Sequence, residues 1–443
     1  NLVEHAATIC IRAKAFLTIS MIITIYPIEL TTFCEGKLLQ MVEKVFSKLK
    51  NANSLKDGSS HSNSNVTDGK PNTDSNPIEG QNDLLLRRCL FELITAMIFV
   101  GQNAMTRAEF IVDKLKTVIS SRRMMISSGA YSSMLDDLAV NYLPAMVHLS
   151  TNRVTRVHVC TPRLLVVVSR LVALGAHVES GSALDRLTIL LPEGIIQQRS
   201  LILRENLTGT IIRELLPELI KRLTSTVVVV REQCLRLVAE VVLLYLDGGT
   251  GVKEALHDVI QNELLPSYHD LLRDVTPIQQ LSFKLLQKIL KTDSMYILHM
   301  QSIELLPVLL DTIPETEKDE PELGIESHQY HQLTKPPVAL LWILSYIGGC
   351  KKVVPDSQFS FKVGAIFTTL GEIYDERKIK IENHQNLNVN IRNQGMLDLK
   401  EWLHASYALL QNLSRRLDLN EDLSAILNKY RHHDMFNNII VQS

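Results

Sequence analysis

A short apolar phrase, two residues that are mostly leucine followed by a proline, recurs along this chain and constrains its fold more than any other feature. The copies are Tyr142-Leu143-Pro144, Leu190-Leu191-Pro192, Leu215-Leu216-Pro217, Leu264-Leu265-Pro266 and Leu305-Leu306-Pro307. Successive prolines are 48, 25, 49 and 41 residues apart. An apolar pattern follows each copy, so the phrase is interpreted as the start of a helix. One phrase used at a recurring interval predicts one structural unit used several times.

Two copies are complete enough to predict a pair of helices each. In one, Pro217 leads the first helix and Val230 opens the second. In the other, Pro266 leads the first helix, and Thr276 as N-cap with Pro277 as first helical residue opens the second. Two-helix units at intervals of roughly 40–47 residues are typical of HEAT and armadillo repeats. Because such pairs cannot bury their apolar faces alone, we predict an all-α, HEAT/armadillo-type α-solenoid of stacked antiparallel helix pairs.

Composition along the chain predicts five stretches. We expect N-terminal repeat helices in residues 1–50 and a flexible Asn/Ser-rich insertion in residues 51–82. The insertion has no aromatic residue, so it cannot bury enough apolar surface to offset the entropy of ordering it. Residues 83–313 are expected to form HEAT/armadillo repeats, residues 314–335 an acidic linker, and residues 336–443 further helical repeats.

Composition and charge exclude several classes of partner. A net charge of −2 creates no field that would attract nucleic acid or an anionic membrane, so neither is expected as a partner. The longest apolar run, residues 15–28, is interrupted by Pro27, whereas a membrane span needs about 20 apolar residues. We interpret this run as a buried helix of the repeat array.

The six cysteines lie far apart without any Cys-x-x-Cys pair, which favours reduced core thiols over disulfides or zinc. This usage predicts a cytoplasmic protein. The chain opens at Asn1 rather than a methionine and is already helical in pattern, so we expect a piece of a longer protein.

A search for catalytic motifs predicts no enzyme, cofactor or metal in this segment. The glycine-rich stretch at residues 248–251 follows a helix and lacks the Lys-Ser/Thr pair of a phosphate-binding loop, so a helix C-cap is favoured. His328 and His331 have a spacing that suits a metal, but they lie in the acidic linker without cysteine partners, and a solvated loop is favoured.

The candidate partner-binding residues are three lysines on one predicted helix. Lys284, Lys288 and Lys291 are spaced four and three residues apart, which places them on one face opposite an apolar stripe. This face would dock an acidic partner, such as a tubulin tail or an acidic peptide; an ordinary solvated helix face remains the alternative. Lys37, Lys44 and Lys48 form a similar series. The acidic stretch at 315–326 would bind a basic partner, cover the lysines or act as a spacer.

Several segments resemble a known family. These are residues 256–272, 215–219, 230–238, 12–17 and 35–39, which are similar to the C-terminal repeat region of the Unc-51-like kinase four proteins. The wider neighbourhood is the Fused-like kinases, and the likeness covers about residues 1–310. It implies an upstream kinase-like domain, often degenerate as in a pseudokinase, and scaffold roles in cilia, at microtubules or in cytokinesis. The family's functional residues lie in that kinase-like domain, so none is carried onto this chain.

We therefore predict a non-catalytic helical-repeat scaffold for protein–protein interaction, and the family resemblance implies that it is the tail of a Fused-like pseudokinase at the cilium or cytoskeleton. Its expected partners are proteins, among them kinase-family or microtubule-associated proteins. The alternative is another HEAT-repeat adaptor, such as a phosphatase scaffold, a transport carrier or a coat subunit. An importin-like carrier needs a ladder of asparagine and tryptophan, and this chain has only Trp342 and Trp402.

Overall fold

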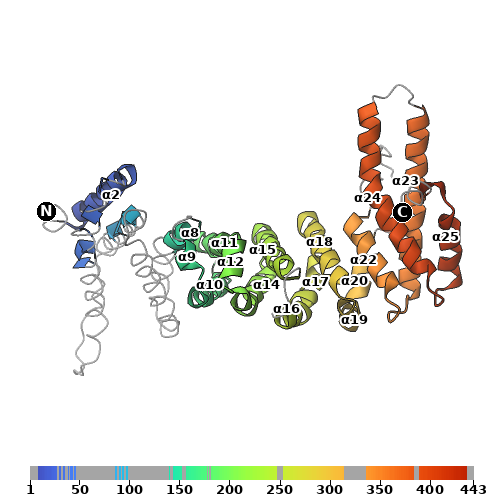
Figure 1. The fold of residues 1–443 in the computed structure, drawn as a ribbon, viewed down its shortest axis with the longest axis horizontal. Coiled ribbons are helices and arrows are strands. Elements are labelled where there is room, and N and C mark those ends of the chain that lie inside the picture. The colour runs from blue at the N-terminus through green and yellow to red at the C-terminus, as the bar shows by residue number, and fades with distance from the viewer. Residues whose placement is uncertain are drawn as a thin grey trace, which may run out of the picture. The chain divides into compact units, whose positions relative to one another are not determined.

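A computed structural model (Figure 1) describes residues 8–26, scattered positions between 29 and 97, residue 139, and residues 143–436 with gaps at 152–155, 177, 179–180, 247–252, 314–335 and 384–388. The side chains of residues 158 and 376–399 are also not described. Within this part every regular element is a helix, so the all-α prediction is confirmed. The expected insertion at 51–82 and acidic linker at 314–335 lie outside the described residues.

The chain divides into two compact units, each described here by itself. The first comprises Asn1–Glu218 and Ser225–Val230, and the second comprises Leu219–Thr224 and Arg231–Ser443.

The first unit begins with α2 (Ile9–Ile25), whose N-cap Thr8 accepts a hydrogen bond from Ile11 N. One stripe of α2 is buried, and Ser20 on it donates to the carbonyl of Glu92 at 3.2 Å. The prediction of a buried helix is right for this face only. Exposed apolar side chains remain on the rest of the helix: Leu17, Met21, Ile22 and Ile25.

The other helices of the first unit form a continuous sequence of short elements. They are α8 (Leu143–Thr151), α9 (Arg156–Val159), α10 (Pro162–Gly175), α11 (Ala183–Ile196), α12 (Arg199–Arg204) and α13 (Thr208–Thr210). Hydroxyls cap the longer two, because Thr161 accepts from Leu164 N and Ser182 accepts from Asp185 N. Gly194 lets α11 approach α8 closely, since a Cβ there would collide with Ser150.

The second unit contains the helices that come later in the chain. Its elements are η4 (Arg222–Thr224), α16 (Lys253–Val259), α17 (Leu265–Leu271), α18 (Thr276–Thr292), α19 (Met295–Ser302), α20 (Leu305–Asp311), α22 (Val338–Gly349), α23 (Ser357–Asn383), α24 (Val389–Ser414), α25 (Glu421–Arg431) and η7 (Asp434–Phe436). The division between the units falls within α14 (Leu216–Lys221) and α15 (Val228–Leu246).

The recurring Leu-Leu-Pro phrase does not mark a helix start in every copy, which corrects the sequence interpretation. Pro192 lies inside α11. Pro217 and Pro266 follow π-helical turns, η3 (Ile211–Leu215) and η6 (Ile260–Leu264), that run directly into α14 and α17. In both, the residue before the proline donates five residues back, Leu216 to Ile211 and Leu265 to Ile260. A proline inside a helix clashes with the carbonyl four residues earlier, and the wider π-turn relieves that clash.

The π-turn before Pro266 also releases a carbonyl for the next repeat. In the five-residue pattern, Gln261 would receive the N–H of residue 266, but proline has none. The Gln261 carbonyl instead lies 2.9 Å from Nε2 of His299 on α19. Since a carbonyl only accepts, His299 donates through Nε2. In the opposite direction along the chain, Nε2 of His269 on α17 lies 3.0 Å from the carbonyl of Ile303.

Helix α22 is held on one side by α24. Trp402 donates its indole N–H to Pro336 O at 2.9 Å, beside the start of α22. At the other end, Arg416 donates to the carbonyls of Gly348, Cys350 and Val353. A guanidinium at this position satisfies carbonyls that a helix end leaves without partners. These contacts fix α22 beside its neighbours.

Candidate protein-interaction surface

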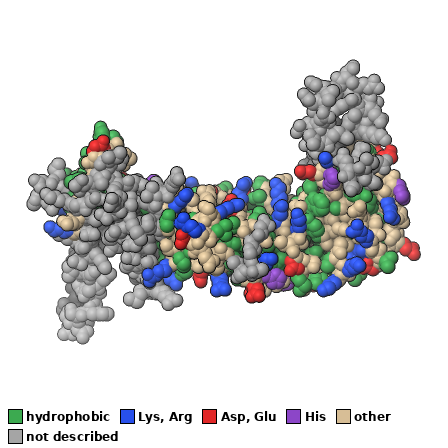
Figure 2. Space-filling model, in the orientation of Figure 1, with side chains coloured by type: hydrophobic (Ala, Val, Ile, Leu, Met, Phe, Trp, Pro, Cys, Tyr) green, Lys and Arg blue, Asp and Glu red, His purple; other side chains and the backbone are tan. Residues whose placement is uncertain are grey.

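Helix α18 has one buried face and one basic face, as predicted. The predicted apolar stripe is buried at Ile278, Leu285, Ile289 and Leu290, and half-buried at Leu281. Lys284, Lys288 and Lys291 are all exposed, with Pro277 and Gln280 continuing the same face toward the start of the helix. Figure 2 shows Lys and Arg side chains gathered over the part of the molecule that α18 occupies in Figure 1. We call Lys284, Lys288 and Lys291 the lysine stripe.

The start of α18 differs from the prediction by one residue. Val275 occupies the N-cap position, Thr276 is the first helical residue, and Thr276 supplies no capping bond. Asp274 accepts the Val275 N–H at 2.7 Å, and Gln279 donates its side-chain amide to Leu272 O at 2.6 Å. The carboxylate one residue earlier therefore stabilises the turn before the helix, and the Thr276 hydroxyl is not needed there.

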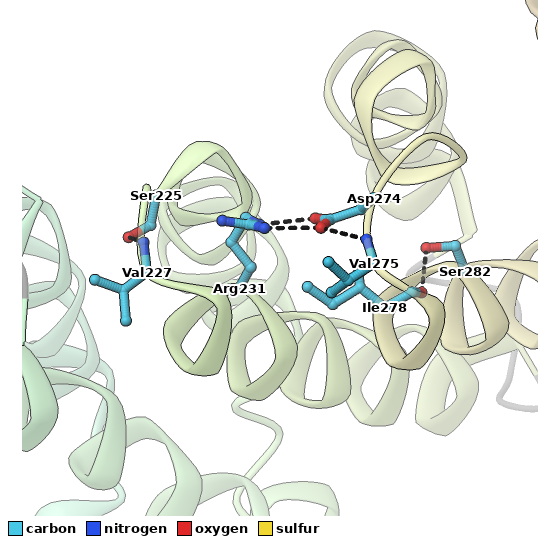
Figure 3. A network of polar contacts seen from close by, with 7 residues as sticks. All are labelled: Ser225, Val227, Arg231, Asp274, Val275, Ile278 and Ser282. Atoms are coloured by element: carbon cyan, nitrogen blue, oxygen red, sulfur yellow. Dashed lines mark hydrogen bonds and ion pairs between the residues drawn. The ribbon is translucent and has the colours of Figure 1, made fainter.

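Asp274 also joins this turn to the preceding repeat through a two-point ion pair (Figure 3). Arg231 of α15 donates from Nε to Oδ2 and from Nη2 to Oδ1, each at 2.7 Å. The two side chains are 16% and 10% exposed. The hydrogen bonds from Arg231 hold the pKa of Asp274 below its ordinary value despite partial burial, and they raise the pKa of Arg231. The planar fork of the guanidinium fixes the angle as well as the distance of this contact.

Hydrogen bonds in the turn before α15 and within α18 complete this network. In the turn before α15, Val227 N donates to Ser225 Oγ at 3.3 Å. Within α18, buried Ser282 donates to the carbonyl of Ile278 at 2.8 Å, so its hydroxyl is satisfied inside the helix. Tyr268 of α17 is fully buried beneath α18 and donates to Ser282 O at 3.2 Å. Burial raises the pKa of Tyr268 far above its ordinary range, so this phenol keeps its proton.

An aromatic pair lies on α22, the helix that packs against α18. Trp342 and Tyr346 are stacked with ring centroids 6.0 Å apart and planes inclined by 27°, and both are half-buried. Burial raises the pKa of Tyr346, and the side chain of Gln287 on α18, which lies against it, opposes that shift. The sequence analysis missed this pair. Its only signal was two aromatic residues four apart, and the surrounding helix is too apolar to show which face meets solvent.

A cavity of about 330 Å³ lies at the C-terminal end of α18. It is lined by Tyr245, Leu246, Lys253, Glu254, Leu256, His257, Thr292, Asp293 and Tyr296. The rings of His257 and Tyr296 lie 4.9 Å apart. Burial, and then the charge of Asp293, raise the pKa of Tyr296 to about 12. Two carboxylates oppose one ammonium among these residues, so the cavity itself does not favour an anion.

Most of the remaining sequence candidates lie outside the described residues. Lys44 is exposed, whereas Lys37 and Lys48 lie outside the described residues, as do residues 248–251, His328, His331 and the acidic stretch 315–326. Among the described residues, no group of three or more His, Cys, Asp and Glu side chains is placed to hold a metal ion. In that same part of the chain, no helix combines the length and apolarity that crossing a bilayer requires.

The cysteine thiols are mostly internal, as expected for core residues. Cys34, Cys89, Cys160 and Cys234 are buried, while Cys10 and Cys350 are of intermediate exposure. Burial raises the pKa of Cys160 to about 11, although nearby Arg156 opposes that shift. A thiol in such a setting stays protonated and unreactive near neutral pH.

Comparison with protein families explains the repeat pattern. Residues 108–298 match the family described as "Serine/threonine-protein kinase ULK4-like, HEAT repeats". This segment is a HEAT-repeat region. Together with the all-helical structure, the match confirms the predicted α-solenoid class. It spans the lysine stripe and the Arg231–Asp274 ion pair, and it ends before the aromatic pair.

A solved structure titled as an engineered protein is also similar to this chain. It has 13% sequence identity, covers 96% of this chain and 96% of its own, and gives a TM-score of 0.30. At that score the two folds differ too much for the likeness to bear on fold or function.

Proposed function

We propose that this chain is a non-catalytic helical-repeat scaffold and that the lysine stripe of α18 docks an acidic protein segment. The observation that carries this proposal is three exposed ammonium groups on one face of a helix whose opposite face is buried. Within the described residues, none of the three forms an ion pair with a neighbouring carboxylate. Their positive charge is therefore available to a partner.

The support beneath the stripe is rigid enough for recognition. The Arg231–Asp274 pair fixes the turn before α18, and Tyr268 packs under the helix. Side chains on a fixed helix lose less entropy on binding than side chains on a moving loop. From Lys284 to Lys291 the helix rises about 10 Å, which matches roughly three to four residues of an extended peptide.

The finer biological setting is also part of this proposal. The matched family description names a kinase, which supports placing this chain as a repeat-containing tail of a Fused-like pseudokinase. In that setting the scaffold acts in the cytoplasm, at the cilium or on microtubules. A glutamate-rich tubulin tail is a partner of the chemistry that the lysine stripe would bind.

The test is a charge reversal with a matched control. The Lys284→Glu, Lys288→Glu, Lys291→Glu variant should stay folded, because the apolar face of α18 is unchanged. A control variant with Lys351→Glu, Lys352→Glu and Lys400→Glu changes the net charge equally at other exposed positions.

Binding of a fluorescein-labelled tubulin C-terminal peptide is measured for both variants at low and high salt. Salt weakens the attraction between exposed charges, with a screening length of about 10 Å at 0.1 M salt. We expect the stripe variant to lose binding and the control variant to keep most of it. Equal loss in both variants would mean that net charge, and not the stripe, attracts the peptide. Unchanged binding in the stripe variant would refute the proposed site.

A further inference from the structure

The aromatic pair on α22 occupies the solvent-facing side of a helix that is otherwise enclosed. The buried positions of α22 are Ala339, Leu340, Leu341, Ile343, Leu344, Ser345, Ile347 and Gly348. Trp342 and Tyr346 are four residues apart, so they share the remaining face. Both rings are partly accessible, so the stacked pair keeps some apolar surface in contact with solvent. Such rings are frequent anchors in protein interfaces.

The pair and the lysine stripe form one surface. Helices α18 and α22 pack directly against each other. The Gln287 side chain, which lies against Tyr346, comes three residues after Lys284 and four residues before Lys291, so it neighbours both lysines on the surface of α18. Tyr346 therefore lies against the side of α18 that adjoins the lysine stripe. The lysine stripe provides positive charge, and the aromatic pair on α22 provides a flat apolar surface.

This combination selects one class of occupant. A cationic side chain would suit an aromatic face alone, but the neighbouring ammonium groups repel it. A run of carboxylates without a ring would use the lysines and leave the aromatic pair uncovered. A peptide that carries both carboxylates and an aromatic ring would use the whole surface, because its ring extends the stack in offset geometry.

We propose that the partner segment is an extended acidic peptide with one aromatic side chain, which packs on Trp342 while the flanking carboxylates meet the lysine stripe. This inference rests on the proposed function and adds the part of the partner that gives specificity. The lysines supply attraction and a fast encounter, and the indole supplies selection among acidic sequences.

The chain carries its own reporter for this contact. It has two tryptophans. Trp402 is 1% exposed and bonded to Pro336 O, so a change of fluorescence on peptide binding comes from Trp342. The probes are two synthetic peptides of eight glutamates each, one with a central phenylalanine and one with a central alanine. They have equal charge and length, so a difference between them measures the ring.

We expect the phenylalanine peptide to bind about tenfold more tightly than the alanine peptide and to shift the Trp342 emission. Trp342→Ala should abolish this preference and leave the affinity of the alanine peptide unchanged. Trp342→Phe keeps a ring and should retain most of the preference. As a control, Tyr374→Ala removes a half-buried ring on α23 that lies against His433, and it should retain the full preference.

The two proposals fail in different ways. Absence of binding by both peptides, or unchanged binding after reversal of the lysine stripe, would refute the proposed function. Equal affinity of the two peptides with a functional lysine stripe would refute only the role of the rings. Equal weakening of both peptides by Trp342→Ala would also refute it, because that result assigns Trp342 to the packing of α22.

Discussion

Breaking the Arg231–Asp274 pair should loosen the contact between two consecutive repeats. The perturbation is Arg231→Met, which keeps an unbranched apolar stem and removes both guanidinium bonds, each 2.7 Å long. A net contribution of about 1.5–3 kcal/mol is typical of a hydrogen bond to a charged group. Removing one partner of a fully buried pair costs about 3–5 kcal/mol.

The expected cost lies below that upper range for two structural reasons. The carboxylate of Asp274 is 10% exposed, so some water reaches it, and it still accepts the N–H of Val275. We therefore expect the variant to lose about 2–3 kcal/mol of local stability. That loss raises the population of the locally open state about 30- to 140-fold.

Hydrogen exchange of the full chain measures this effect, because a repeat array of this size need not unfold in one step. Amides of α15 and α18 should exchange faster in Arg231→Met, while those of α10 in the first unit serve as an internal reference. A double-mutant cycle with Asp274→Asn should show that the two substitutions together cost less than their sum. Additive costs, or exchange unchanged in α15 and α18, would refute the view that this pair ties the repeats together.

The same pair predicts a pH dependence. Because the hydrogen bonds from Arg231 lower the pKa of Asp274, protons bind this carboxyl more tightly in the unfolded chain than in the folded one. Its contribution to stability is full above the unfolded value of about 3.9 and is lost as the pH falls through the lowered folded value. Protection of α18 should therefore decline in this acidic window in the natural chain. The decline should be smaller in Arg231→Met.

Two further predictions concern packing. Leu285→Asp should cost about 3–5 kcal/mol and speed hydrogen exchange in α17–α20, because Leu285 is 2% exposed and the new charge has no partner; the same change at exposed Gln280 should have little effect, and equal effects would contradict this placement of α18. Gly371→Ala should destabilise the contact of α23 with α25, since a Cβ there lies 2.8 Å from Cε1 of Tyr430. Gly209→Ala meets nothing within 4 Å and should stabilise by up to about 1 kcal/mol. Thermal unfolding of the two glycine variants checks the opposite signs.

The sequence predicted those parts of the structure that depend on local periodicity. The helical spacing of apolar and polar residues along α18 predicted that Leu285 is buried and Lys288 exposed, because a helix turns by a constant angle per residue. It could not reveal the Arg231–Asp274 pair, since its partners are 43 residues apart and meet only when two repeats stack. The orientation of Trp342 was hidden for another reason. Helix α22 is apolar on nearly every side, so its pattern does not identify the exposed face.

The misread proline phrase has a related cause. A proline is compatible with the first turn of a helix, and this commonest position was the basis of the interpretation. At Pro217 and Pro266 the preceding residues adopt π-helical hydrogen bonds instead, and the helix continues through the proline. Sequence composition does not separate a proline that begins a helix from one that sits behind a π-turn.

Pro266 leaves the carbonyl of Gln261 without an N–H donor from its own helix. This restricts which repeats of the array can be exchanged for one another. Gln261 O accepts a hydrogen bond from His299, which lies 38 residues further along the chain. If the repeat beginning at α19 were exchanged for one lacking a donor at that position, this acceptor would be left to water or to the apolar interface, at a cost of about 1–3 kcal/mol. Recombination between repeats of this array is thus restricted by a proline and a histidine that share no sequence motif. A chimera designed by aligning repeats alone would have to carry both residues together.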